Sequence, residues 1–164
     1  MKTLFKLVTA TQAPRATLPV RFMVGTVFFE EGIQKFLFAD LLGAGQFARI
    51  GIPAPEVMGP IVGTVEIICG ALIFAGLLTR LAAIPLLINI SVAILSTKIP
   101  ILLGHDFMCF HVAKLARYGF WSMASEARTD FSMLLGSLFL LIVGTGHYSP
   151  DACLRRKLKE KSHE

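Results

Sequence analysis

The sequence is poor in charge. Only 16% of its 164 residues are Asp, Glu, Lys or Arg, whereas 54% are hydrophobic. Soluble globular domains carry about 25% charged residues, because their surface must contact water. This deficit argues against an ordinary soluble domain and predicts an integral membrane protein, for which the lipid bilayer takes the place of water.

Paired cysteines and familiar catalytic motifs are also absent. The three cysteines, Cys69, Cys109 and Cys153, form no CxxC pair, so a disulfide framework is excluded. We interpret each as a small apolar side chain rather than a redox group. The sequence has no Gly-rich phosphate loop, no HExxH motif and no Ser/His/Asp set. No catalytic residue is therefore assigned.

Metal ligands are sparse. His105, Cys109 and His111 lie close together in the sequence and are the only weak candidates for a metal site. A structural zinc site needs four ligands, usually supplied by two paired motifs, and a second pair is missing. No metal cofactor is predicted.

Basic residues gather at both ends of the chain. Lysines and arginines lie before the first apolar segment and again in the final residues, at Arg155, Arg156, Lys157, Lys159 and Lys161. Positively charged flanks around apolar segments are typical of cytoplasmic loops. We therefore expect both termini in the cytoplasm and no binding of nucleic acid, although the net charge is +5.

Four apolar segments, at 17–38, 57–78, 81–99 and 131–148, approach the roughly 20 residues that cross a bilayer. Between the last two, residues 107–123 carry His111, Lys114 and Arg117 at intervals of three, which predicts an amphipathic helix lying in the membrane interface. The predicted fold is an all-α membrane protein: a bundle of four transmembrane helices with this interfacial helix between helices three and four. Residues 1–16 form a cytoplasmic segment, 17–148 a single membrane domain, and 149–164 a basic cytoplasmic tail.

Orientation has one conflicting feature. Four crossings with cytoplasmic ends place Lys98, Lys114, Arg117 and Arg128 on the outer side, against the usual bias. Asp106, Glu126 and Asp130 lie nearby in the sequence and reduce this conflict.

Glycines recur on one face of the first two segments. Gly59, Gly63 and Gly70 share a helical stripe with Glu66, and Gly25 and Gly32 share one with Lys35. Small residues at this spacing let two membrane helices approach closely. We therefore predict that these glycines pack helices together and that the charged residues point inward.

The charged residues within the segments form a candidate polar pocket. An ionisable group at the bilayer centre costs about 2.5–3.5 kcal/mol, so it needs a partner or a function. Glu31 and Lys35 are spaced for an ion pair, and Glu66 adds a second carboxylate. Either Arg128 supplies the second cation or one carboxyl group keeps its proton. The predicted pocket lies in the outer half of the bundle, and its residues are Glu31, Lys35, Glu66, Asn89, Trp121 and Arg128.

An ordered set of motifs resembles the DoxX family of small bacterial membrane proteins. It comprises Arg21-Phe-Met-Val-Gly25, Gly32-Ile-Gln-Lys35, Phe47-Ala-Arg-Ile-Gly51, Gly63-Thr-Val-Glu66, Gly76-Leu-Leu-Thr79-Arg80, Phe120-Trp-Ser-Met and Gly144-Thr-Gly146. The resemblance covers about residues 21–151. It implies a four-helix protein of the inner membrane, and some relatives are associated with redox complexes, thiosulfate:quinone oxidoreductase among them. Lys35 and Glu66 match polar positions of the family.

Three functional hypotheses follow. The first is an accessory subunit of a membrane redox system, quinone-linked or thiol/sulfur-linked, with a redox protein or a quinone as partner. The second is a non-catalytic scaffold or binding protein whose polar cluster is purely structural. The third is a small-molecule carrier with a proton-linked glutamate. A homo-oligomer is compatible with each, and quinone is the one cofactor these features suggest.

Overall fold

The computed structural model describes residues 17–146 and residue 150, and the named secondary-structure elements of this part of the chain are all helices. Its long helices are α2 (Thr17–Leu37), α5 (Pro55–Ala75), α6 (Thr79–Ala93) and α9 (Arg128–Val143). The short elements are α3 (Ala39–Leu42), α4 (Ala44–Ile50), the π-helix η1 (Ile94–Lys98), α7 (Ile99–Leu103) and α8 (Phe120–Glu126). The predicted all-α class is confirmed. The predicted segment 1–16, most of the tail 149–164, the end of the fourth span and Cys153 lie outside the described residues.

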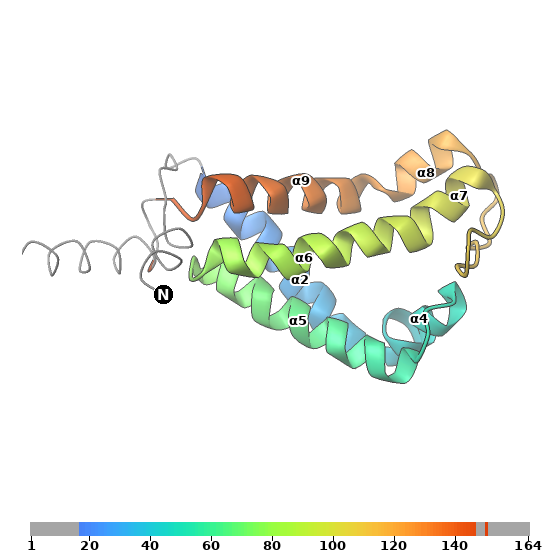
Figure 1. Ribbon diagram of the computed structural model, residues 1–164, viewed down its shortest axis with the longest axis horizontal. Helices are drawn as coiled ribbons and strands as arrows, with labels where there is room; N and C mark the ends of the chain where they lie inside the picture. Colours follow the sequence, from blue (N-terminus) through green and yellow to red (C-terminus); the bar gives the residue numbers. More distant parts are fainter. Residues whose placement is uncertain (1–16, 147–149, 151–164) are drawn as a thin grey trace, which may run out of the picture.

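The long helices form two pairs that meet at one end of the molecule and diverge at the other (Figure 1). We refer to each pair as a leg. α2 packs along α5, and α6 packs along α9. The apolar core lies where the legs meet, around Val24, Phe28, Ile73, Leu86 and Leu140. Toward α4, α7 and α8 the legs diverge. We refer to the end of the molecule at α4, α7 and α8 as the wide end.

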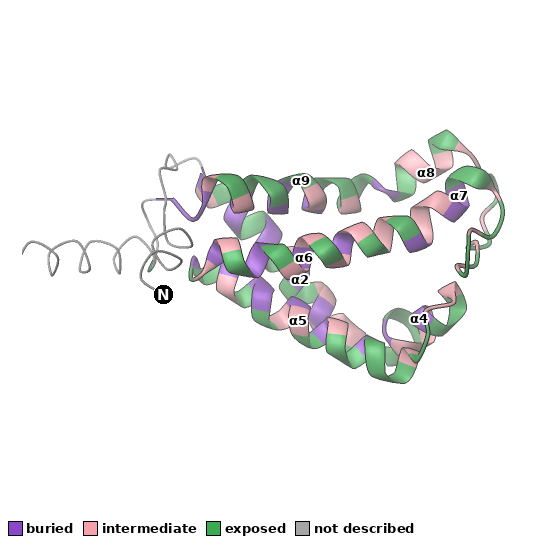
Figure 2. Ribbon diagram, viewed as in Figure 1, coloured by how far each residue is buried: buried purple, intermediate pink, exposed green. Residues whose placement is uncertain are grey.

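The outward faces of the long helices are apolar and exposed. Ile68, Ile88, Leu135 and Ile142 are each more than half exposed, and Figure 2 shows buried residues confined to the inner faces. Two helices, Pro55–Ala75 and Thr79–Leu103, are long and apolar enough to cross a membrane. An apolar exterior of this extent matches a hydrocarbon solvent.

The second of these helices continues through a proline. Sequence spacing placed its end at Ile99, but α6, η1 and α7 run without a break to Leu103. Pro100 lies in the first turn of α7, directly after the π-turn of η1. A local π-turn lets a helix continue through a proline, because it re-satisfies the backbone groups that the proline frees.

The expected glycine packing places α2 against α5 at very short range. A Cβ added at Gly32 would lie 2.7 Å from the Gly63 carbonyl oxygen, and one at Gly25 would lie 2.7 Å from the Phe74 nitrogen. Only glycine fits such an approach of two backbones. The packing glycines lie at helix contacts: Gly25, Gly32, Gly63 and Gly70 between α2 and α5, and Gly59 between α5 and α4.

The predicted interfacial helix over 107–123 is wrong for most of its length. Residues 105–119 are irregular apart from an isolated bridge between Phe107 and Phe110, and only α8 is helical. Side chains hold this loop: the Val112 amide donates to Asp106 Oδ1 at 2.8 Å, and Tyr118 Oη donates to the Ala113 carbonyl at 3.2 Å. Such side-chain bonds to the backbone compete with a helix.

Candidate functional site

Three helices meet at the carboxylate of Glu66. Its Oε2 lies 2.6 Å from Lys35 Nζ on α2, and its Oε1 accepts a hydrogen bond of 2.6 Å from Asn89 Nδ2 on α6. Glu66 is 1% exposed. An ion pair with an extra hydrogen bond satisfies a buried carboxylate from both sides. We refer to Lys35, Glu66 and Asn89 as the polar triad.

Local sequence explains how the triad assembles. Glu66 lies on the glycine-lined face of α5, and α2 approaches that face closely enough for Lys35 to reach it. A short turn then reverses the chain, with Gly76 and Leu78 at positive φ. Because Glu66 and Asn89 lie at nearly equal distances along the chain from this turn, antiparallel packing brings them side by side.

The expected ion pair between Glu31 and Lys35 does not form. Among the described residues, Lys35 pairs with Glu66, and no ion pair is present at Glu31. The buried carboxylate of Glu66 has less access to water than the half-buried one of Glu31, so it gains more from the ammonium. Glu31 is left facing the cavity next to the triad.

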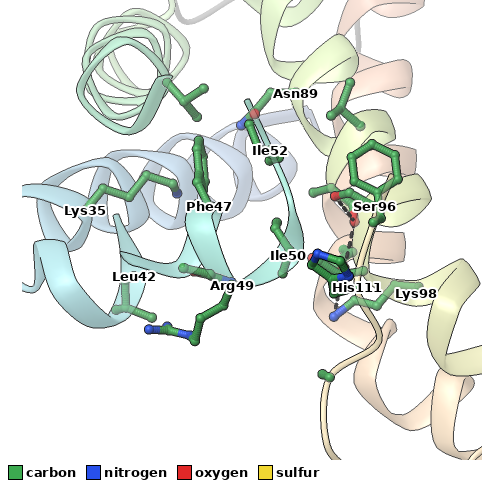
Figure 3. A pocket seen from close by; sticks show the side chains of 18 of the residues that line it. Lys35, Leu42, Phe47, Arg49, Ile50, Ile52, Asn89, Ser96, Lys98 and His111 are labelled. Atoms are coloured by element: carbon green, nitrogen blue, oxygen red, sulfur yellow. Dashed lines mark hydrogen bonds and ion pairs between the residues drawn. The ribbon is translucent and has the colours of Figure 1, made fainter. Parts of the chain in front are cut away.

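The triad lies on the wall of a cavity of about 1080 Å³ at the wide end of the molecule. Figure 3 shows Lys35 on one side of this space and Ser96 and Lys98 on the other. The walls come from α2, α3, α4, α5, the continuous helix 79–103, the loop at 110–115 and the start of α9. Many are apolar, including Met58, Val62, Ile90 and Ile101. The cavity can therefore hold an organic molecule with a polar end at the triad.

A second ion pair lines the same cavity. Lys98 Nζ lies 3.0 Å from Asp130 Oδ2, with side chains 16% and 19% exposed. It joins the π-turn of η1 to α9. Sequence reasoning missed this pair, because the two residues were considered only as loop charges. The available signal was that two residues of opposite charge lie at the ends of neighbouring predicted spans.

Two predicted pocket residues lie elsewhere. Trp121 is 84% exposed and contacts Phe120 at a ring-centroid distance of 5.3 Å. Arg128 Nε donates to the Ser125 carbonyl at 2.8 Å. Neither residue lines the cavity. Of the predicted set, the structure brings together Glu31, Lys35, Glu66 and Asn89.

The loop between α7 and α8 closes one side of the cavity. The His111 amide donates to the Ile50 carbonyl at 3.0 Å, which ties the loop to α4. His111 Nδ1 is hydrogen-bonded to Asp106 Oδ2 at 2.9 Å. This bond, with that from Val112, holds the pKa of Asp106 below its usual value. Within the described residues, no group of three or more His, Cys, Asp or Glu side chains is arranged to hold a metal ion.

Comparisons with known proteins agree with these features. The family model described as DoxX matches residues 16–99. The chain is 48% identical to an uncharacterized membrane protein of Mycobacterium tuberculosis over 89% of this chain and 85% of that protein. It is 33% identical to a Bacillus subtilis protein named "Putative oxidoreductase CatD", over 82% and 84% of the two chains. No solved structure gives a significant match.

Proposed function

The chain belongs to the DoxX family of membrane proteins, and from this premise we propose that it binds a quinone-type ligand in the cavity beside the polar triad. In this role it serves as an accessory subunit of a membrane redox system. The observation that carries the proposal is the position of the triad, which lies on the wall of a cavity with many apolar lining residues.

The triad has hydrogen-bond donors to spare. An ammonium has three N–H donors and an amide nitrogen has two. Lys35 and Asn89 each direct one group at Glu66, so N–H groups remain for a ligand carbonyl. A quinone carries carbonyl oxygens on an otherwise apolar ring. Its chemistry therefore matches donors set within apolar walls.

The charges lining the cavity favour a neutral ligand. Its Lys and Arg residues are Lys35, Arg49, Lys98 and Lys114, and its acidic residues are Glu31, Glu66, Glu126 and Asp130. The two sets are equal in number, and two cations are already paired with acids. A quinone is uncharged, whereas an anionic sulfur compound would meet carboxylates without a surplus of cations. The name of the Bacillus subtilis relative also supports a redox role.

The same proposal includes four crossings of the bacterial inner membrane, with both termini in the cytoplasm and the cavity on the outer side. Arg21 Nη1 donates to the Thr145 carbonyl at 3.1 Å, so the start of α2 and the end of α9 lie at the same end of the bundle. An even number of crossings follows if both ends are on one side. The inward-facing charges of α2 are compatible with a spanning helix.

The test is binding of menadione, a quinone without a tail, to the protein in lipid nanodiscs. We expect saturable binding, measured as a ligand-dependent rise in melting temperature and as quinone retained above empty nanodiscs. Lys35→Met and Asn89→Leu should each weaken binding about tenfold, which corresponds to one lost hydrogen bond to a charged or amide donor. Glu56→Gln on α5 is the matched control, because Glu56 is exposed and does not line the cavity.

Each alternative predicts a different result. A protein that binds no menadione, with variants that change only the folded yield, would favour the structural scaffold. Uptake of a substrate into proteoliposomes that depends on pH and on Glu66 would favour the carrier. Mass spectrometry of proteins that co-purify in native lipid would identify the redox partner that the proposal requires.

A further inference from the structure

The cavity has exposed lining residues of two kinds. A residue that both lines a cavity and is exposed marks an edge where the cavity opens. All the exposed charged and imidazole side chains of the lining, Arg49, His111, Lys114 and Glu126, lie on α4, α8 and the connecting loop at the wide end of the bundle, where Leu41, Leu42, Pro53 and Ala113 are also exposed. Met58 on α5 and Val92 on α6 mark a second, apolar edge on the side.

The apolar edge begins directly beside the polar triad. The bond between Asn89 and Glu66 joins α6 to α5. Val62 lies four residues from Glu66, about 6 Å along α5, and Val92 lies three residues from Asn89, about 4.5 Å along α6. Both valines line the cavity. α5 and α6 diverge toward α4 and α7 (Figure 1), and the cavity that both valines line lies at this wide end.

The surroundings of this edge are apolar. On α5, Ile61 is 51% exposed, and on α6 Ile88 is 61% exposed, with Leu95 in the next segment at 47%. These side chains lie on the helices that are long and apolar enough to cross the membrane. The edge between α5 and α6 therefore faces hydrocarbon, whereas the charged edge faces the interface or water.

We propose that the ligand is a lipid-soluble quinone with a long apolar tail, whose head binds at Lys35 and Asn89 and whose tail leaves sideways between Val62 and Val92 into the bilayer. The proposal rests on the quinone function proposed above and adds the ligand class and its route. A tail directed through the charged edge would carry apolar surface into water, which is unfavourable. A tail that stays in lipid avoids that cost.

The experiment compares two quinones with the same ring in nanodiscs: menadione and a menaquinone with an isoprenoid tail. Val62→Trp and Val92→Trp place a bulky ring at the side opening, and Ile68→Trp is the control on the exposed face of α5 outside the cavity lining. We expect Val62→Trp and Val92→Trp each to lower the affinity for the tailed quinone at least tenfold and to change the affinity for menadione less than twofold. The control should bind both quinones as the wild type does.

A second variant tests the side route even if Val62→Trp and Val92→Trp fold poorly. Val92→Cys, in a Cys109→Ser and Cys153→Ser background that leaves only the buried Cys69, is purified folded and then modified with a bulky maleimide, and binding is compared before and after modification. Selective loss of the tailed quinone supports the side route. Equal retention of both quinones, or equal loss of both, overturns it.

The two proposals fail separately. If the wild type does not bind menadione, the proposed quinone site is wrong. If the wild type binds menadione but not the tailed quinone, the quinone site stands and the side route is wrong. The same conclusion follows if Val62→Trp and Val92→Trp change the binding of both quinones equally.

Discussion

At the scale of single residues, the decisive group is the carboxylate of Glu66. It is 1% exposed and is held by Lys35 and Asn89 from two other helices. Breaking one side of a buried ion pair costs more than removing the whole pair, because an unpartnered charge stays behind. The triad therefore contributes to helix register, in addition to the ligand binding that we propose for it.

We expect Lys35→Met to lower the free energy of unfolding by about 3–5 kcal/mol, because it leaves the Glu66 carboxylate buried without its cation. Glu66→Gln should cost less, since the amide keeps a bond with Asn89. The double variant should recover part of the loss. The measurement is unfolding in detergent for the wild type, both single variants and the double variant. Strictly additive losses would contradict coupling between the two side chains.

Asp106 sets the shape of the loop at the cavity edge. Because hydrogen bonds from His111 and Val112 lower its pKa, the folded loop favours the ionised carboxylate. The stabilisation is present above the ordinary aspartate pKa of about 4. It is lost as the pH falls through the lower value in the folded protein.

The corresponding prediction concerns the Val112 amide, which donates to Asp106 Oδ1. Its protection from hydrogen exchange, corrected for intrinsic rates, should fall as the pH is lowered below about 4. Asp106→Asn should remove this dependence. Unchanged pH dependence in that variant would show that another group controls the loop.

At the scale of elements, the contact of α2 with α5 depends on glycine. Each Cβ at this contact would meet backbone atoms, which cannot rotate away as a side chain does. The sequence pattern predicted which face of each helix is involved. It could not predict that Gly59 packs on α4, because α4 and its placement depend on the turn that follows α3.

We expect Gly32→Ala to destabilise the protein by about 1–3 kcal/mol, the usual cost of overpacking. The added Cβ would lie 2.7 Å from the Gly63 carbonyl oxygen. Ala71→Leu on the exposed face of α5 is the matched control and should be nearly neutral. Melting in detergent gives the comparison. A stability of Gly32→Ala equal to that of the control would mean that the helices separate without cost.

The loop at 105–119 shows where periodicity misleads. His111, Lys114 and Arg117 recur at helical spacing, yet the backbone there is irregular. The side chain of Asp106 takes backbone donors that a helix would need, and Gly119 at φ 105° ends the segment. Regularly spaced polar residues indicate that their side chains are exposed. An exposed loop can carry the same spacing as an exposed helix.

At the scale of the whole molecule, the two legs meet at the end where the described chain begins and ends, and diverge at the other end (Figure 1). The cavity follows from that divergence, because packed helices would leave no space at Glu31 and Lys98. The proposed four crossings, with both termini in the cytoplasm, would place the cavity and the loop with Cys109 on the outer side.

The native cysteines test this orientation. Cys109 is exposed and Cys69 is buried. We expect a membrane-impermeant maleimide to label Cys109 in intact spheroplasts, and Cys109→Ser to abolish that labelling. In the Cys109→Ser variant, Cys153 of the tail should react only after permeabilisation. Labelling of Cys109 that itself requires permeabilisation would reverse the proposed orientation.

Composition and residue spacing were enough to predict a membrane protein, its helical class and the inward faces of α2 and α5, because they reflect local burial directly. They also placed Lys35, Glu66 and Asn89 among the candidates. The packing of the helices was needed to show that Lys35 pairs with Glu66 instead of Glu31, and that Trp121 and Arg128 lie away from the cavity. These outcomes depend on distances between different helices, and spacing within one helix does not contain them.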